Sequence, residues 1–195
     1  MKVAVFGKIR AGKGLVIETL KDYFEKIGFT TEHLEFSDPV RDVVNTLFPW
    51  NNGVKDREVY IKTAQHLRKM NEDIWVDCLR YMIQNSKAEV VFVGGFRQEN
   101  EYRMLKELGF SLIKVEADEE IRYKRCVDSN DKFERETLKN HTENVMEEFE
   151  FDYYITNNAT VEELREKVLT VGKDLVFKKH FNETVRGNLI ESFRR

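Results

Sequence analysis

The chain opens with MKVAVFGKIRAGKG over residues 1–14, and residues 7–14 carry its clearest signal. They have the G-x-x-x-x-G-K spacing of a phosphate-binding loop, or P-loop. In such a loop Gly7 and Gly12 let the backbone turn so that its amides face a polyphosphate, and Lys13 adds a cation beside the β- and γ-phosphates. The helix that follows offers its positive N-terminal end to the same anion. The spacing therefore predicts a nucleotide-phosphate site.

The sequence on both sides of this loop supports the prediction. Residues 3–6, VAVF, form an apolar run typical of a buried parallel strand. After the loop, apolar residues recur at helical spacing from Ile17 to Ile27, and Gly28 ends the pattern. The alternative is an ordinary glycine-rich turn with a solvated lysine, which does not explain two glycines at this spacing followed by Lys13.

One position departs from the usual P-loop. Gly14 follows Lys13 and Leu15 comes next, whereas P-loops usually carry a Ser or Thr whose hydroxyl helps to hold Mg²⁺. We therefore expect any Mg²⁺ to depend on phosphates, water and other carboxylates. This departure argues against a GTPase-type switch more than it argues against a kinase.

Composition limits the class of protein. The chain has 195 residues, which suits one domain over residues 1–195. A net charge of −3 indicates that neither nucleic acid nor a membrane is the main partner. Cys78 and Cys126 fit no metal-ligand spacing, so we expect reduced thiols in a cytoplasmic protein. No apolar run reaches membrane-spanning length, and neither a membrane span nor a signal peptide is expected.

Strand and helix signals alternate along the chain, which predicts a three-layer α/β fold with a central parallel sheet. After residues 3–6, further strands are expected at residues 33–36, 89–93, 111–115 and 153–156. Residues 39–86 are expected to form a helical insert whose last two helices break near residues 71–73. The polar, charged residues 127–140 are expected to form a lid.

Capping residues mark two later helices. Asp118 is expected to cap the helix that follows it, and Thr160 with Glu163 forms a capping-box pattern at the start of the last helix. Apolar signals weaken beyond Lys179, so we expect a separate short terminal helix there.

Phosphoryl transfer depends on positive charge around the moving phosphate and on alignment of donor and acceptor. Arg97 follows the third predicted strand, at the end where ligands bind in parallel α/β sheets. Arg122 and Arg125 share one helix face as the chain enters the lid, and Arg57 and Arg68 belong to the insert. A solvated or ion-paired surface arginine is the alternative for each.

Asp38 directly follows the second predicted strand. It is a candidate to orient an acceptor hydroxyl or a Mg²⁺-bound water, and the alternative is that it caps the next helix. Trp75 and Tyr60 are candidates to flank a base ring, and the alternative is that they belong to a core. We assign no role to the histidines, which have no ligand spacing and no nearby nucleophile.

The chain resembles the phage and bacterial deoxynucleoside monophosphate kinases, within the P-loop nucleoside monophosphate kinase superfamily. The order and spacing of short motifs over residues 1–175 carry the resemblance. These motifs are GKIRAGKG at 7–14, FSDPV at 36–40, KDRE at 55–58 with Gln65, DIWV at 73–76, GFR at 95–97 with Asn100 and Glu101, HTE at 141–143, FD at 151–152, ITNN at 155–158 and EL at 163–164. Animal-type phosphomevalonate kinases share several of them.

The resemblance implies where each substrate binds. ATP would occupy the P-loop through Gly7, Arg10, Ala11, Gly12, Lys13, Gly14 and Leu15, with Arg122 beside it. The acceptor monophosphate would lie between the insert and Arg97, near Asp38, Arg57, Gln65, Arg68 and Trp75. The charged lid would close over both.

A second departure from the family concerns the metal. The family has an acidic residue two positions before the arginine, whereas this chain has Gly95. Together with Leu15, this weakens the expected support for Mg²⁺. An Asp introduced at position 95 is therefore expected to lower the Mg²⁺ concentration that the enzyme needs.

These observations indicate a single-domain P-loop kinase with ATP and Mg²⁺ as cofactors and small-molecule nucleotides as partners. The catalytic candidates are Lys13, Arg97, Arg125 and Asp38. The expected acceptor is a (deoxy)nucleoside monophosphate. Alternatives are a phosphomevalonate kinase-like or dephospho-coenzyme A kinase-like activity and a non-catalytic nucleotide-binding module. The oligomeric state stays open, with a homodimer as one candidate.

Overall fold

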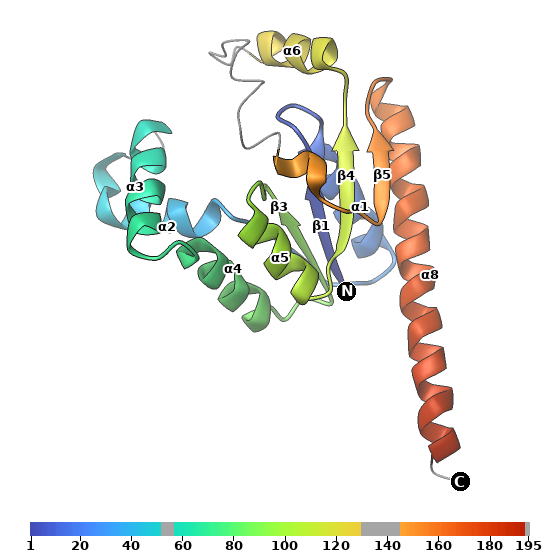
Figure 1. Cartoon of the computed structure of the whole chain (residues 1–195). Coiled ribbons are helices and arrows are strands. Elements are labelled where there is room, and N and C mark those ends of the chain that lie inside the picture. The colour runs from blue at the N-terminus through green and yellow to red at the C-terminus, as the bar shows by residue number, and fades with distance from the viewer. Residues whose placement is uncertain (52–56, 130–144, 194–195) are drawn as a thin grey trace.

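The computed structural model describes residues 1–51, 57–129 and 145–193. Within these residues the chain forms a five-stranded sheet with helices on both faces (Figure 1). The strands are β1 Lys2–Phe6, β2 Thr31–Glu35, β3 Val90–Gly94, β4 Ser111–Glu116 and β5 Tyr153–Thr156. They lie in the order β2-β3-β1-β4-β5, and every neighbouring pair is parallel. The predicted three-layer α/β fold with a parallel sheet is confirmed.

Helices alternate with these strands as the sequence indicates. They are α1 Lys13–Lys26, α2 Asp38–Leu47, α3 Arg57–Met70, α4 Ile74–Asn85, α5 Glu99–Glu107, α6 Glu119–Asp128 and α8 Val161–Phe193, with 3₁₀ turns η1 Pro49–Asn51 and η3 Met146–Glu148. The predicted break near residues 71–73 separates α3 from α4. There the Asn71 side chain accepts a hydrogen bond from the Asp73 amide at 3.0 Å, which turns the chain between the helices.

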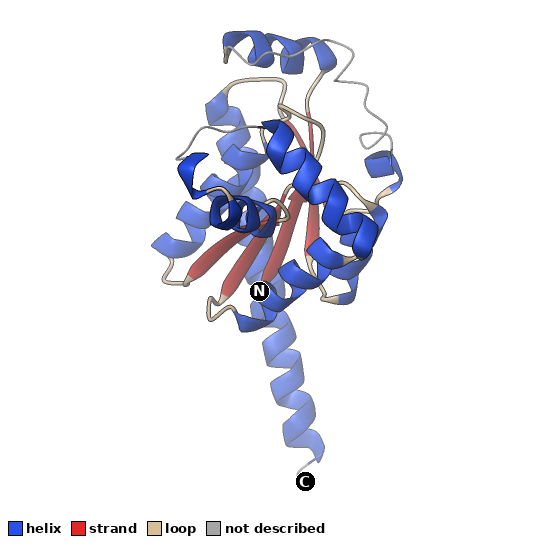
Figure 2. Cartoon of the chain, turned by 90° about the vertical axis from the view of Figure 1, so that its left-hand side faces the viewer, coloured by secondary structure: helices blue, strands red, loops and turns tan. Residues whose placement is uncertain are grey.

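The central strands are buried on both faces, so their apolar residues serve two cores. Phe6 and Val93 pack with α4 and α5 on one face. Val5 and Phe92 pack with α1 and α8 on the other. Figure 2 shows the sheet between these two helical layers. This packing fixes the carboxyl ends of β1 and β3, from which the P-loop and Arg97 follow.

The helical insert has a small core of its own. Val40 and Val44 of α2 pack with Trp75 of α4, and α3 covers them. In Figure 1 α3 lies away from the sheet, on the outer side of α2 and α4. The insert therefore stands beside the carboxyl edge of β2 and β3.

The last helix corrects one expectation. Leu164 and Val168 are buried as predicted, but α8 continues unbroken to Phe193 rather than giving way to a separate terminal helix. Its second half extends past the amino end of the sheet (Figure 1). Phe177, in the middle of the helix, is 67% exposed. None of the helices in the described residues, α8 included, has the length and apolarity needed to cross a membrane.

The two predicted caps have different outcomes. Thr160 Oγ1 accepts a hydrogen bond from the Glu163 amide at 3.2 Å, which confirms the cap at the start of α8. Asp118 occupies the N-cap position of α6 but makes no side-chain cap. Asp118 is thus the N-cap residue as predicted, but its carboxylate accepts a hydrogen bond from Asn158 Nδ2 at 2.8 Å instead of one from the helix backbone.

Candidate functional site: a P-loop flanked by two groups of arginines

The P-loop connects β1 to α1 at the carboxyl edge of the sheet. Lys13 Nζ donates hydrogen bonds to the carbonyl oxygens of Gly7, at 2.9 Å, and Lys8, at 3.0 Å. Its ammonium is therefore held against the backbone at the start of the loop rather than extended into solvent. This is the position from which a lysine reaches phosphates that the loop encloses.

The two glycines of the motif allow close approaches that no other residue would permit. Gly7 has φ +147° and Gly12 has φ +103°. A Cβ on Gly7 would clash with the Val115 carbonyl oxygen of β4, and one on Gly12 would clash with Asn157 Nδ2. Arg10, at φ 59°, is the one non-glycine residue with positive φ among the described residues. The loop is thus pressed against β4 and Asn157, which fixes its curvature.

Arg122 and Arg125 of α6 both reach the P-loop, as their shared helix face predicts. Arg122 is 3% exposed and donates to the carbonyl oxygens of Ala117, at 3.1 Å, and Ile9, at 3.4 Å. Its buried guanidinium therefore supports the P-loop backbone at Ile9. A buried arginine bound to main-chain oxygens is a positioning residue in this state rather than one exposed to a ligand.

Arg125 is closer to open space. Its Nη1 donates to the Arg10 carbonyl oxygen at 3.2 Å, and its Nη2 donates to Asn157 O and Oδ1 at 3.0 and 3.2 Å. Burial lowers the pKa of the Arg125 guanidinium from its usual value. The side chain still lines a cavity of about 420 Å³ next to the P-loop.

This cavity includes residues that sequence reasoning missed. Besides Arg10, Gly12, Leu15 and Arg125, it is lined by Asp128, Ser129, Asn157, Ala159 and Val161. Asn157 is 6% exposed and donates from Nδ2 to the Ala11 carbonyl oxygen at 2.8 Å. The available signal was its place directly after the last strand, at the ligand-binding edge of a parallel sheet. The cavity is within the size range of small-ligand pockets, about 300–1,000 Å³.

A second group of arginines gathers around Glu101 of α5, which is 4% exposed. Glu101 Oε2 accepts hydrogen bonds from the amides of Arg97, at 2.7 Å, and Gln98, at 3.1 Å. Glu101 Oε1 pairs with Arg68 Nη2 at 3.4 Å. Burial raises the pKa of the Glu101 carboxyl, although the two amide hydrogen bonds and the charges of Arg68 and Arg97 act in the opposite direction. Arg68 of the insert and Arg97 after β3 are thus brought to one place.

Other predicted acceptor residues have mixed outcomes. Trp75 is 2% exposed and donates from Nε1 to the Ala64 carbonyl oxygen at 3.2 Å, so it belongs to the insert core and has no face for a base ring. The core alternative is therefore confirmed. Gln65 is exposed on α3. Arg57 is the first residue of α3, and its side chain lies outside the described part of the structure, as do residues 130–140 of the expected lid.

The structure contradicts one of the two predictions for Asp38, the cap of α2. Ser37, not Asp38, occupies the N-cap position of α2. Asp38 Oδ2 accepts a hydrogen bond from the Glu35 amide at 2.7 Å, and Oδ1 pairs with Arg41 at 3.2 Å. The Asp38 carboxylate therefore ties the end of β2 to α2, and its role toward a substrate stays a prediction.

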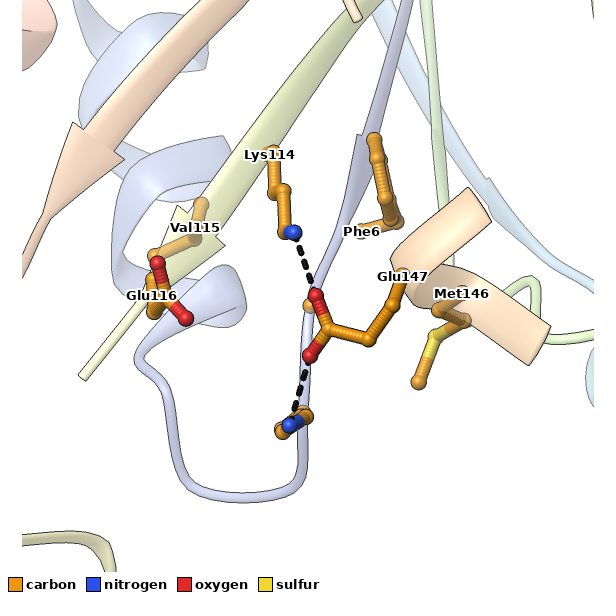
Figure 3. A pocket seen from close by; sticks show the side chains of 8 residues that line it. Phe6, Lys114, Val115, Glu116, Met146 and Glu147 are labelled. Carbon is orange, nitrogen blue, oxygen red and sulfur yellow. Dashed lines mark hydrogen bonds and ion pairs between the residues drawn. The ribbon is translucent and has the colours of Figure 1, made fainter. Parts of the chain in front are cut away.

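A small pocket beside the P-loop contains an ion-pair bridge (Figure 3). Glu147 of η3 lies 2.6 Å from Lys8 Nζ and 2.7 Å from Lys114 Nζ. Hydrogen bonds from Lys114 and Lys8 lower the pKa of the Glu147 carboxyl. The bridge fixes the first lysine of the P-loop to β4 and η3, and sequence reasoning did not anticipate it.

The donor set fits a metal that arrives with the nucleotide. The described residues contain no group of three or more His, Cys, Asp or Glu that could hold a metal ion. Mg²⁺ in phosphate-transfer sites is usually held by one or two carboxylates together with phosphates and water. Gly14 has nothing within 4 Å of the position where a Cβ would lie, so the first turn of α1 leaves room for this ligand shell.

Comparisons with known proteins give the family and the fold of the chain. The sequence model of the AAA domain family matches residues 3–150. The chain belongs to the AAA domain family. None of the curated proteins matches the sequence of this AAA-domain protein.

Solved structures resemble this AAA-domain protein over most of its length. Shikimate kinase from Acinetobacter baumannii in complex with shikimate is 19% identical, with a TM-score of 0.57 over 91% of this chain and 94% of that one. Shikimate kinase from Aquifex aeolicus is 14% identical, with a TM-score of 0.52 over 89% and 96%. TT1252 from Thermus thermophilus is 18% identical, with a TM-score of 0.53 over 88% and 95%. The chain shares its fold with these structures.

Proposed function

We propose that this protein is an ATP-dependent phosphotransferase that moves the γ-phosphoryl group to a (deoxy)nucleoside monophosphate. The observation that carries the proposal is the arrangement of cations around the P-loop. Lys13 lies in the loop, Arg125 lines the cavity on one side of it, and Arg97 with Arg68 gathers at Glu101 next to the insert. Charge of this kind stabilises a phosphoryl group as it leaves one oxygen and reaches another.

Each group has a separate role in this proposal. Lys13 binds the β- and γ-phosphates, and the loop amides hold the rest of the polyphosphate. The cavity lined by Leu15, Asn157 and Val161 takes the nucleoside of ATP. Arg125 stands between this cavity and the loop, where its guanidinium can follow the charge of the phosphates. Mg²⁺ bound with ATP supplies further neutralisation of the phosphate charge.

The acceptor side rests on Arg97 and Arg68. Arg97 is exposed, yet its backbone is fixed by Glu101, so the guanidinium projects from a rigid turn. Arg68 is 30% exposed and is bound by the same carboxylate, which leaves part of its fork for a ligand. Two arginines at one carboxylate, Arg68 through its side chain and Arg97 through its backbone amide, suit the dianionic phosphate of a monophosphate acceptor. Arg57 and Gln65, both on α3, extend this site toward the nucleoside in the proposal.

Other acceptors would use the same cations. Phosphomevalonate and dephospho-coenzyme A also carry phosphates, and shikimate, named for one of the similar structures, carries a carboxylate that two arginines would bind. The 19% identity to that shikimate kinase gives no reason to prefer shikimate as the acceptor. A nucleotide-binding module without transfer is the alternative outside the enzymes.

The test is a coupled ADP-release assay with ATP and Mg²⁺ across these acceptors and the common nucleoside and deoxynucleoside monophosphates. We expect turnover of one or more monophosphates, with Lys13→Ala as the inactive control. Turnover of phosphomevalonate, dephospho-coenzyme A or shikimate alone would replace the proposed acceptor. ATP binding without turnover of any acceptor would leave the binding module as the function.

A further inference from the structure

The carboxylate of Glu35 lies beside Gly94 and Gly95, two residues without side chains. Glu35 ends β2 and is in register with Gly94 of β3. A Cβ built on Gly94 would clash with Glu35 Oε1, and one built on Gly95 would clash with Glu35 Oε2. The Glu35 carboxylate therefore fills the space of both missing side chains at the end of β3.

This space faces the P-loop helix. The Cβ position of Gly94 is also 3.1 Å from Ile17 Cδ1 of α1. Ile17 comes three residues after Gly14, so both lie on the same face of α1. Gly14 has open space beside it. Helical side chains lean toward the N-terminus, which places the carboxylate alongside the first turn of α1.

Glu35 is held in this position from its own strand and from α2. Oε1 lies 3.0 Å from His33 Nε2, two residues earlier on the same strand face. Its amide is bound by Asp38 Oδ2. The side chain remains 31% exposed, so an ion in the crevice can reach it.

We propose that Glu35 supplies, from the neighbouring strand, the carboxylate that the chain lacks at position 95, and that it holds Mg²⁺ of the bound nucleotide. The proposal rests on the proposed function. It assigns Mg²⁺ one protein carboxylate, directly or through water, with phosphate oxygens and further waters completing the shell. It also explains the two glycines, because any side chain at position 94 or 95 would displace the carboxylate.

This geometry reverses an expectation from the sequence. Gly95 has φ +74°, a left-handed conformation that strains an Asp, and the side chain of that Asp would meet Glu35 Oε2. Gly95→Asp therefore places two carboxylates in one space instead of restoring one. We now expect Gly95→Asp to weaken metal binding rather than strengthen it.

The test measures metal binding without turnover. Mn²⁺ replaces Mg²⁺, a non-hydrolysable ATP analogue replaces ATP, and electron paramagnetic resonance reports free Mn²⁺ with protein in excess over nucleotide. We expect Glu35→Gln to raise the Kd for Mn²⁺ by about tenfold or more, as loss of a carboxylate near a metal commonly does. Binding of the analogue without metal should stay at the wild-type level.

Matched variants separate this role from a loss of folding. Glu32→Gln removes a carboxylate from the same strand, where Glu32 accepts a hydrogen bond from Ser86, and should leave the Mn²⁺ Kd unchanged. Glu35→Asp keeps a carboxylate and should lie between wild type and Glu35→Gln, which gives a reading even if the Gln variant unfolds. Wild-type Mn²⁺ affinity in Glu35→Gln overturns the assignment of Glu35 and leaves the proposed function standing. If Glu35→Gln unfolds, wild-type affinity in both single variants Glu35→Asp and Gly95→Asp has the same meaning. Failure of the wild-type protein to bind the analogue overturns the proposed function as well.

Discussion

Glu147 Oε1 lies 2.6 Å from Lys8 Nζ, which joins η3 to the second residue of the P-loop motif. The same carboxylate binds Lys114 of β4, so one side chain connects three elements around the start of the loop. These pairs predict that the loop's position depends on the ionisation of Glu147.

The dependence has a defined direction with pH. Hydrogen bonds from Lys114 and Lys8 lower the pKa of Glu147 below its ordinary value of 4.5. A carboxyl with a lowered folded-state pKa stabilises the fold above its ordinary value and loses this contribution as pH falls through the folded-state pKa. Below pH 4.5 we expect the melting temperature of the wild type to fall more steeply than that of Glu147→Gln. Parallel melting curves for the two, with Glu148→Gln as the surface control, would contradict this prediction.

Lys13→Ala should abolish phosphoryl transfer and leave the melting temperature nearly unchanged. The Lys13 ammonium donates to the carbonyl oxygens of Gly7 and Lys8, and the side chain belongs to neither apolar core beside the sheet. Lys21→Ala, on the same helix with a partly exposed lysine, is the matched control and should keep full activity. Transfer at the wild-type rate in Lys13→Ala would remove the P-loop from the mechanism.

Arg97→Ala should lower kcat by about a hundredfold or more, which is the usual effect of losing one transition-state donor. The melting temperature should hold, because Glu101 binds the backbone amide of Arg97, which the variant keeps. Arg103→Ala on α5 is the control, since Arg103 pairs with Glu99 on the surface. A structural Arg97 would give the reverse result, with stability lost and kcat of the folded protein preserved.

Arg125→Ala should lower both kcat and stability. The Arg125 guanidinium donates hydrogen bonds to Asn157 and to the Arg10 carbonyl oxygen, and the variant removes them. A fully buried acceptor left without a donor costs about 1–3 kcal/mol, and we expect a smaller loss here because these hydrogen bonds are partly buried and water can replace the donor. Arg125→Lys keeps the charge but cannot reach all of these acceptors at once, so we expect it to lose stability as Arg125→Ala does. An unchanged melting temperature in Arg125→Ala would show that these hydrogen bonds contribute nothing.

Local pattern was enough to predict β1, the P-loop and α1, because the apolar run, the two glycines and the helical repeat all lie within residues 3–27. The length of α8 was not predictable in this way. Apolar spacing weakens beyond Lys179, yet the helix continues to Phe193. The position of Glu35 over Gly94 depends on the register of β2 and β3, which are 59 residues apart at this pair. This position therefore comes from pairing between distant segments, which local pattern does not record.

Glu101 offers a prediction that separates acceptor positioning from chemistry. Glu101→Gln keeps an oxygen for the amides of Arg97 and Gln98 but removes the negative charge that holds Arg68. Arg68 should then lose its fixed position, so we expect KM for the acceptor to rise several-fold while kcat changes less.

Glu101→Gln should also change how the stability of the protein depends on pH. Burial raises the pKa of Glu101 above its ordinary value of 4.5, so ionisation opposes folding. This cost is absent below pH 4.5 and is complete once pH exceeds the raised pKa, and stability of the wild type should therefore decline across that window. Glu101→Gln should lack this decline when melting temperature is followed from pH 4 to 8. A larger fall in kcat than rise in KM, or an unchanged pH profile, would mean that Glu101 does not hold the two arginines in the way the structure indicates.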